Sequence, residues 1–287
     1  MTNSLPSENH KNKVKSSLGD VFCDLKTHLE VADIIQNHKS NRQDIREIAL
    51  AELNLSKVKS IIDLGCGFGF FTRGLVGKVK KNTKIIGVDR HVKCKQFYLD
   101  SCKHAELKGQ FISGGIGEIK SIKENSIDLV ICSYALYFFP EYLEDIARIL
   151  KSDGTFVAIT HSYPHMVEFT TYVKTILHGA GFYSGNNLPY EELIKGFSNV
   201  NGVELLSKWF GTIKSEKITS SLVFNYDDYH CFEKYFRFKK SFFIPPNITN
   251  EDVQCEVILE SLKNDMKLQS KIEISKKDII FICQKPT

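Results

Sequence analysis

The segment from residue 58 to residue 76 reads VKSIIDLGCGFGFFTRGLV, and it decides the fold. A β-branched run that ends at Ile62 predicts a buried strand of a parallel sheet. An apolar run over residues 70–76 then opens a helix, and three glycines at alternate positions separate the two elements: Gly65, Gly67 and Gly69. A strand, a glycine turn and a helix in this order predict the first part of a nucleotide-binding βαβ unit. In such a turn a ligand lies against bare backbone, where a Cβ atom would clash.

An acidic residue beside the turn indicates what kind of ligand it binds. Asp63 stands at the end of the predicted strand, where a carboxylate would repel a pyrophosphate. The dinucleotide fingerprint would need a glycine in place of Phe70, and the phosphate-binding G-x-x-x-x-G-K-[ST] loop is absent. The same carboxylate would attract a ligand that carries an ammonium and a sulfonium group. S-adenosylmethionine (SAM) is such a ligand, and it has no phosphate.

A second acidic residue has the spacing of a ribose ligand. The next strand, residues 84–88, ends in Asp89, which follows Gly69 by 20 residues. An acidic residue at this distance binds ribose hydroxyls in nucleotide-binding folds. The pattern Asp63-x-Gly65-x-Gly67-x-Gly69 with Asp89 resembles motifs I and II of the class I SAM-dependent methyltransferases. The alternative is a glycine turn in an unrelated α/β domain.

Two later segments resemble the type 11 methyltransferase pattern. They are IDLVICSYALYFFP at residues 127–140 and KSDGTFVAIT at residues 151–160, so the resemblance covers about residues 57–161. It implies an α/β fold with a Rossmann-like, doubly wound and mostly parallel sheet of about seven strands. It also implies a transferase with SAM as its cofactor.

The resemblance carries SAM-binding roles to particular residues. Asp63 is expected to hold the methionine end of SAM, Asp89 the ribose, and Arg90 to flank the adenine. Where the family commonly has Gly-Asp-Ala this chain has residues 114–116, Gly-Gly-Ile, so the adenine contact is expected from backbone groups or from Glu118. Ile116 is expected to pack on the adenine, and Ser133 to offer backbone to the methionine moiety. The predicted cofactor-binding set is Asp63, Gly65, Cys66, Gly67, Gly69, Asp89, Arg90, Gly115, Ile116 and Ser133.

Catalytic residues are harder to predict, because methyl transfer from a sulfonium mainly requires alignment of the reacting groups and exclusion of water. A general base is needed only if the nucleophile must lose a proton. His161, just past the fifth predicted strand, is the first candidate, since the pKa of histidine suits proton removal near neutral pH. Tyr134 and Tyr137 are expected to line the pocket with their rings near the sulfonium. Weaker candidates, for which surface exposure or core packing is the alternative, are Tyr163, His165, Tyr172 and His178.

The sequence favours a small, partly apolar acceptor over a nucleic acid. The fourth strand ends in CSYALY, residues 132–137, which is not the [DN]-P-P-[YF] motif of adenine-N6 and glutamine methylation and has no Pro-Cys pair of cytosine-C5 chemistry. Residues 234–240, KYFRFKK, predict either a nucleic-acid patch or an amphipathic helix with its aromatic residues inward. The mild net charge, 38 − 34 = +4, favours the helix.

Composition indicates a globular chain in a reducing compartment. Hydrophobic residues make up 42% and charged residues 25% of the 287 residues. None of the eight cysteines forms a C-x-x-C pair, so no metal site is predicted, and a cytoplasmic location is expected. No signal core precedes the first predicted helix, and the longest apolar run, residues 129–140, is too short to span a bilayer. We therefore predict no membrane partner and a monomer or homodimer.

The predicted domain organisation has five parts: a mobile leader at 1–20, an N-terminal helical cap at 21–56, the SAM-binding core at 57–220, a helical lid at 221–269, and the last core strand within 270–287. A sixth strand is expected at residues 203–213.

Two other functions remain open from sequence. One is a SAM-binding enzyme of the same fold that acts as a cyclase or lyase and releases methylthioadenosine. The other is a non-catalytic SAM-binding subunit of another methyltransferase.

Overall fold

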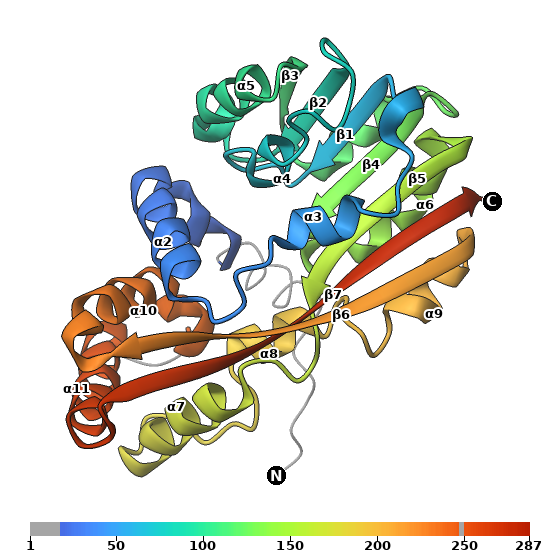
Figure 1. Ribbon diagram of the computed structural model, residues 1–287. Coiled ribbons are helices and arrows are strands. Elements are labelled where there is room, and N and C mark those ends of the chain that lie inside the picture. Colours follow the sequence, from blue (N-terminus) through green and yellow to red (C-terminus); the bar gives the residue numbers. More distant parts are fainter. Residues whose placement is uncertain (1–17, 247–249) are drawn as a thin grey trace. The chain divides into compact units, whose positions relative to one another are not determined.

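The computed structural model describes residues 18–246 and 250–287, so residues 1–17 of the predicted leader lie outside it. The chain divides into two units (Figure 1). The core unit comprises residues 42–163, 194–218 and 277–287. The described part of the helical unit comprises residues 18–41, 164–193, 219–246 and 250–276.

Within the described residues one sheet has seven strands in the order β3-β2-β1-β4-β5-β7-β6. β1 to β5 are mutually parallel, whereas β7 runs antiparallel to β5. This arrangement confirms the predicted doubly wound, mostly parallel α/β fold. The strands are β1 Ser60–Leu64, β2 Lys84–Asp89, β3 Lys108–Ser113, β4 Ile127–Ser133, β5 Leu150–His161, β6 Phe210–Asn225 and β7 Lys271–Pro286.

The strand order places a switch point between β1 and β4. From β1 the chain adds β2 and then β3 on one side, and it then crosses to add β4 and β5 on the other. Leu64 at the end of β1 pairs with both Val88 and Cys132, so the carboxyl ends of three strands lie level at one edge of the sheet. Ligands of open α/β sheets bind at such an edge, next to the point where the order reverses.

Helices cover both faces of the core sheet, which is why β1 is apolar at successive positions. Ile61 belongs to a buried cluster with Tyr98 of α5 (Lys95–His104) and Phe71 of α4 (Phe70–Arg73). Ile62, which must point to the opposite face, is also fully buried. The α6 helix, Leu143–Ile149, buries Ile146 and Ile149 and packs on β5. A short helix before β1, α3, spans Ile45–Leu50.

The strand predicted over residues 203–213 is confirmed only from Phe210 onward. Residues 202–207 form a helix, α9 (Gly202–Ser207), and β6 begins only at Phe210. Gly202 and Leu206 are buried while Glu204, which the alternation of a strand would place on the same face, is exposed, so the pattern is that of a helix. The apolar residue types alone favoured the strand.

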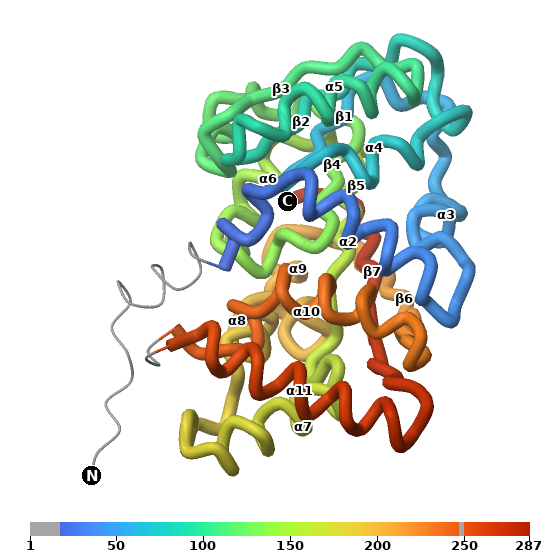
Figure 2. Tube along the Cα trace, turned by 90° about the vertical axis from the view of Figure 1, so that its left-hand side faces the viewer, coloured from blue at the N-terminus to red at the C-terminus, as the bar shows by residue number. Residues whose placement is uncertain are grey.

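The helical unit is built around an aromatic core. Its helices are α2 Leu25–His38, α7 Val167–Gly179, α8 Pro189–Ile194, α10 Tyr229–Phe243 and α11 Glu251–Gln269. α10 packs on α2 and α11, and α11 packs on α7 (Figure 2). Phe232, Phe236 and Phe243 of α10 are buried, and each lies with its ring centroid 5.1–6.2 Å from that of Phe169 of α7. Residues 221–225 of the predicted lid belong to β6, and helices occupy most of the rest. That this segment and residues 21–56 act as lid and cap stays a prediction.

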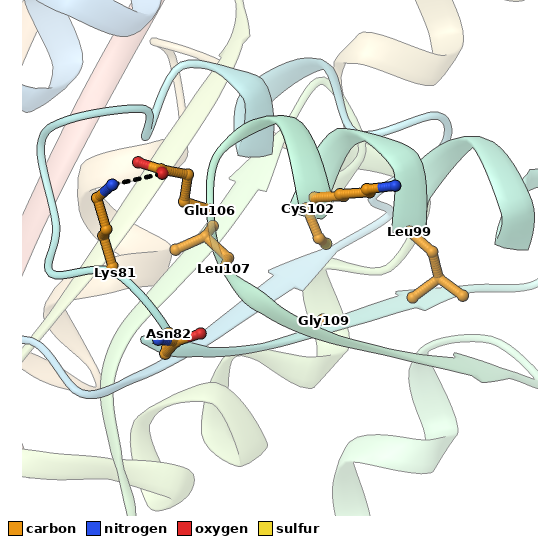
Figure 3. A pocket seen from close by; sticks show the side chains of 8 residues that line it. Lys81, Asn82, Leu99, Cys102, Glu106, Leu107 and Gly109 are labelled. Atoms are coloured by element: carbon orange, nitrogen blue, oxygen red, sulfur yellow. Dashed lines mark hydrogen bonds and ion pairs between the residues drawn. The ribbon is translucent and has the colours of Figure 1, made fainter.

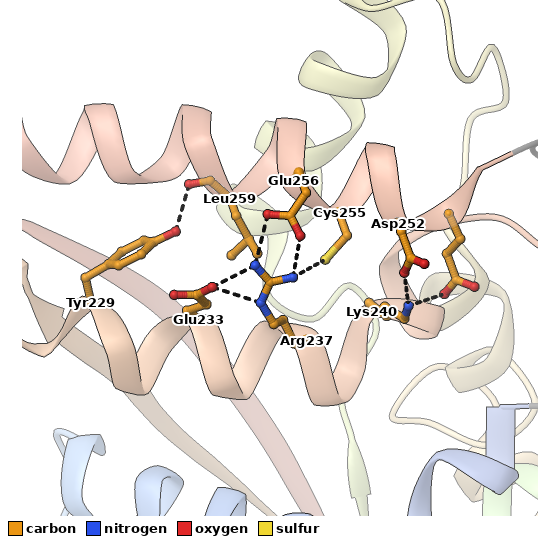
Figure 4. A network of polar contacts seen from close by, with 9 residues as sticks. Tyr229, Glu233, Arg237, Lys240, Asp252, Cys255, Glu256 and Leu259 are labelled. Carbon is orange, nitrogen blue, oxygen red and sulfur yellow. Dashed lines mark hydrogen bonds and ion pairs between the residues drawn. The ribbon is translucent and has the colours of Figure 1, made fainter.

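The basic segment 234–240 is the exposed side of α10, and its cations pair with carboxylates of the same unit. Arg237 binds Glu233 of its own helix and Glu256 of α11 (Figure 4). Lys240 lies 2.7 Å from Asp252 of α11, and Lys234 lies 2.8 Å from a carboxylate of α2. Tyr235 and Phe236, between these cations in sequence, are buried. The segment is thus an amphipathic helix.

One glycine of β2 leaves room for the packing that supports the glycine turn. A Cβ atom at Gly87 would lie 2.4 Å from Cζ of Tyr98 and 2.7 Å from Sγ of Cys66. Because both neighbours are buried, neither has space to move. We expect Gly87→Ala to destabilise the protein by roughly 1–3 kcal/mol, the usual cost of overpacking, in chemical denaturation.

Gly179→Ala is the matched control for this substitution. A Cβ atom there meets nothing within 4 Å, and its φ is not in the left-handed region. The control should leave stability unchanged or slightly raised, since alanine is the better helix former. Equal effects of the two substitutions would contradict the packing argument.

Candidate active site

All three glycines of the turn have left-handed backbone, with φ of +65° at Gly65, +49° at Gly67 and +87° at Gly69. A Cβ atom at Gly65 would lie 2.5 Å from Cβ of Ala135, and one at Gly69 would lie 2.6 Å from Cβ of Ser101. At Gly67 nothing lies within 4 Å of that position. The outer two glycines are therefore required by contacts within the protein. The middle one presents bare backbone to open space.

Asp89 braces this turn from the end of β2. Its Oδ2 accepts a hydrogen bond of 2.9 Å from the amide of Gly67, and its Oδ1 accepts one of 2.8 Å from the amide of His91. A carboxylate offers about four acceptor positions, so two such bonds leave capacity for the hydroxyl groups of a ligand.

Asp63 is a buried acid below the turn. It is 2% exposed, and its Oδ2 accepts a hydrogen bond of 2.7 Å from the hydroxyl of Thr72. Burial raises the pKa of Asp63 to about 7, partly opposed by that hydrogen bond and reinforced by the charge of Asp89. A carboxyl group in this position would be fully ionised by a cationic ligand, because a nearby positive charge favours the charged form.

The loops after β2 and β3 lie next to each other. A Cβ atom at Gly115, whose φ is +90°, would be 3.7 Å from Cβ of Arg90. The Glu118 side chain lies against Gly114, where a Cβ atom would come within 2.6 Å of its Oε1. Ile116 follows as the first residue of a 3-10 helix, Ile116–Ser121, and is half-buried. The carboxylate of Glu118 thus lies beside Gly114, one residue before the position of the family's aspartate.

The end of β4 is strained and carries an unsatisfied hydroxyl. Tyr134 has a φ of +55°, a conformation that costs a non-glycine residue on the order of 1 kcal/mol or more. Its amide donates to the carbonyl of Ile159 at 2.8 Å, which holds the turn in place. The buried Oγ of the preceding Ser133 has no hydrogen-bond partner within the described residues.

His161 at the end of β5 is held by a residue that sequence reasoning missed. Its Nδ1 lies 2.7 Å from Oδ1 of Asp278, and the hydroxyl of Tyr134 donates to Oδ2 of the same carboxylate at 3.1 Å. The rings of Tyr134 and Tyr137 lie 4.8 Å and 6.0 Å from the imidazole. Burial raises the pKa of both tyrosines well above 10, so they are neutral hydroxyl groups and not bases. The one usable signal for Asp278 is its position directly before the apolar run of residues 279–283.

The other candidates have structural partners. Lys195 lies over the ring of Tyr163 with its ammonium nitrogen 5.5 Å from the centroid. In the helical unit, Tyr172 donates to Asp265. The imidazole of His178 lies 3.0 Å from a backbone carbonyl. The ring of His165, which is 1% exposed, has its centroid 5.8 Å from that of Tyr190. Of the predicted catalytic residues, His161, Tyr134 and Tyr137 are brought together.

A separate cleft of about 510 Å³ lies at the opposite edge of the core sheet (Figure 3). Its lining includes Leu99, Leu107 and an ion pair of 2.6 Å between Lys81 and Glu106. It opens near the amino ends of β2 and β3, whereas the glycine turn, Asp89 and His161 lie at carboxyl ends. The cleft is therefore not part of the candidate active site.

The family of the chain follows from its match to a family profile. The profile described as "Methyltransferase domain" matches residues 55–224, more than half of the chain. The chain belongs to this methyltransferase family. The predictions of a class I SAM-dependent methyltransferase and of SAM as the cofactor are thereby confirmed.

Individual relatives of this methyltransferase are distant. The demethylmenaquinone methyltransferase of Bacillus cereus strain B4264 is 22% identical over 210 residues, which cover 69% of this chain and 87% of that one. A protein from Bacillus halodurans C-125 is 13% identical with a TM-score of 0.54, over 85% of this chain and 99% of that one. The YcgJ protein from Bacillus subtilis is 16% identical with a TM-score of 0.50, over 84% and 97%. The two structures support the fold.

Three features at the carboxyl edge of the methyltransferase sheet fit SAM. Gly67 offers open space against bare backbone, Ser133 has an unsatisfied buried hydroxyl, and Asp63 is an acid whose ionisation a cation would complete. The thiol of Cys66, between the glycines, has its pKa raised by burial and is not a nucleophile at neutral pH.

The buried carboxyl group of Asp63 should lower the stability of the ligand-free methyltransferase at neutral pH. The pKa of Asp63, about 7 in the folded protein, exceeds its ordinary 3.8, so stability falls as pH rises between these values. We expect Asp63→Asn to stabilise the ligand-free protein above about pH 7, by at most about 4 kcal/mol at 1.36 kcal/mol per pKa unit. The gain should vanish near pH 4. Thermal unfolding across this range measures it.

Asp128→Asn, in β4, is the control with the opposite sign. Burial alone would raise the pKa of Asp128. Hydrogen bonds from the Lys151 side chain, the Lys59 amide and Ser60 outweigh burial and lower this pKa. Asparagine there should reduce stability at neutral pH and lose this effect in acid. A neutral or destabilising Asp63→Asn at about pH 8 would refute the assignment of a costly buried charge.

Proposed function

We propose that this methyltransferase transfers a methyl group to a small, partly apolar molecule that gives up a proton to His161. The observation that carries the proposal is the histidine at the end of β5, which has two tyrosine rings 4.8 and 6.0 Å away and is bound to Asp278. SAM supplies a methyl group made electrophilic by its sulfonium. An acceptor that carries a proton must lose it as the new bond forms, and a base at this edge of the sheet would take it.

The proposed SAM contacts follow the strand ends. Asp63 attracts the ammonium group, and the Gly67 backbone lies against the ligand. Asp89 accepts the ribose hydroxyls while it braces the turn. Ser133 offers its hydroxyl to the methionine moiety. Arg90, Gly115, Ile116 and Glu118 surround the adenine.

Aromatic side chains support an acceptor that is at least partly apolar. Tyr134 and Tyr137 present rings beside His161, and Phe138 follows with its ring 5.0 Å from that of Tyr137. A relative carries the name demethylmenaquinone methyltransferase, so a demethylated quinol is a rational first acceptor to test. The pairing of the α10 cations with carboxylates disfavours a nucleic acid.

We also propose a reducing, cytoplasmic environment, supported by eight cysteines that are all free thiols. In the described ranges, every helix is too short or too polar to cross a bilayer. A monomer or homodimer stays the prediction for assembly.

Loss of SAM affinity should follow from two substitutions at the turn. Gly67→Val fills the space that the ligand needs, and Asp89→Ala removes both the ribose acceptor and the brace of the turn. We expect each to weaken SAM binding by at least about 100-fold in isothermal titration calorimetry, the size of one or two lost charge-assisted hydrogen bonds.

Two variants control for strain and for charge. Gly77→Val imposes the same left-handed strain at a φ of +69°, also with nothing within 4 Å, but away from the strand ends. Asp153→Ala removes an exposed acid of β5 at the opposite edge of the sheet. Normal SAM binding in both turn variants, or equal losses in variants and controls, would remove this edge as the SAM site.

Product analysis tests the reaction itself. Purified protein is incubated with SAM alone and then with a metabolite extract or a demethylated quinol, and the nucleosides are identified by mass spectrometry. S-adenosylhomocysteine that appears only with acceptor supports the proposal. Methylthioadenosine from SAM alone would instead indicate a cyclase or lyase.

The base is tested with the acceptor so found. We expect His161→Ala to lower turnover by at least ~100-fold, the low end for lost acid–base catalysis, with SAM binding retained. His104→Ala, which removes an exposed histidine at the end of α5, should have no effect. Unchanged turnover in His161→Ala would exclude this histidine from the mechanism.

A further inference from the structure

Asp278 faces His161 because of the strand register, not through a chance contact of side chains. β7 runs antiparallel to β5, and the two residues are direct partners in the ladder. Their side chains are 6% and 13% exposed. The next step of the ladder is closed by the amide of Ser162, which donates to the carbonyl of Lys277 at 2.8 Å. The backbone therefore fixes the carboxylate beside the imidazole.

The distance between the two side chains decides which imidazole nitrogen carries hydrogen. Nδ1 of His161 and Oδ1 of Asp278 are 2.7 Å apart, a hydrogen-bond length. An ionised carboxylate has only acceptor positions, so a lone pair on Nδ1 would face a lone pair on Oδ1. A hydrogen on Nδ1 removes this repulsion. In the neutral ring the lone pair then belongs to Nε2.

Tyr134 completes the arrangement. Its hydroxyl donates to Oδ2, so each carboxylate oxygen has its own donor and the group cannot rotate without losing one bond. Because Tyr134 is fixed in its left-handed turn by the 2.8 Å bond to Ile159, the donor position is itself constrained by β5.

We propose that Asp278 is the positioning residue of this methyltransferase, which holds His161 with hydrogen on Nδ1 and leaves Nε2 as the proton acceptor. The inference rests on the proposed function, in which His161 is the base. It adds a residue that lies outside residues 55–224, the range of the family match.

The proposal accounts for the movement of charge in the reaction. Nε2 of His161 takes the proton of the acceptor as the acceptor's electron pair forms the bond to the methyl carbon. The carbon–sulfur pair stays on sulfur, which becomes a neutral thioether. One positive charge disappears at sulfur and one appears on the imidazole, where the Asp278 carboxylate stabilises it. The proton then leaves His161 to solvent.

Nitrogen-15 NMR of histidine-labelled protein tests this directly, without any acceptor. The chain has nine histidines, and comparison with His161→Ala assigns the signals of interest. At a pH where the ring is neutral, we expect hydrogen on Nδ1 in the native protein. In Asp278→Leu, which removes both acceptor oxygens, the ring should change to hydrogen on Nε2. In Tyr134→Phe, which keeps the ring and loses only one donor, Nδ1 should stay protonated.

Kinetics give the second readout once an acceptor is known. Asp278→Leu should lower kcat by at least ~100-fold while KM for the acceptor and Kd for SAM stay within about threefold, because the base is misoriented and not the substrate. Hydrogen on Nε2 in the native protein would overturn the proposal even if Asp278→Leu failed to fold. An unchanged tautomer in Asp278→Leu would overturn it as well.

The two levels of inference fail separately. If His161→Ala keeps its turnover, the proposed base is wrong whatever the tautomer. If His161→Ala loses turnover while Asp278→Leu keeps its kcat, the base stands and the positioning role of Asp278 falls.

Discussion

The left-handed backbone at three alternate positions after β1 is the constraint on which the site depends. Each of the three glycines is needed for a different reason. Gly65 lets the end of β4 approach at Ala135, and Gly69 lets α5 approach at Ser101. Only Gly67 is open, and Asp89 holds its amide from the next strand. The turn thereby fixes β2, β4 and α5 around one small surface of exposed backbone. A chain with side chains at these positions would have to separate elements that now touch.

Three unfavourable features of the molecule lie at this same edge of the sheet. Asp63 is a buried acid whose pKa is raised to about 7. Tyr134 has a left-handed backbone conformation, which is unfavourable for a tyrosine. Ser133 has a buried hydroxyl without a hydrogen-bond partner in the described chain. The interiors of β4 and β5, residues 129–132 and 156–159, are in contrast buried and apolar. Strain and unsatisfied polar groups persist where the surrounding packing imposes them, and they concentrate where ligands bind. Left-handed backbone also occurs at the opposite edge, at Asn82 and Glu106 of the cleft, so the buried acid and the unsatisfied hydroxyl distinguish the carboxyl edge and backbone strain does not.

The sequence was sufficient for those parts of the structure that local chemistry determines. Glycine spacing, apolar strand runs and acids at strand ends predicted the parallel core and its carboxyl edge. Residues 203–207 form a helix although their apolar residue types favour a strand, because Gly202 and Leu206 are buried while Glu204 between them is exposed. The pairing of Asp278 with His161 was out of reach for another reason: 117 residues separate them, and only the antiparallel register sets which residues oppose each other. The sequence predicts both strands but not which of their residues lie opposite each other.

The position of β7 in the sheet determines which truncated forms of this protein expose a strand edge. It inserts between β5 and β6, although it is the last strand of the chain. A chain cut after Phe224, where the family match ends, would retain the glycine turn but leave β5 as an open edge. Val157, Ile159 and their neighbours would then present unpaired backbone on an apolar strand, the kind of surface that recruits other chains. A fragment that ends where the family match ends would therefore tend to associate. The shortest fragment that stays monodisperse must include β7.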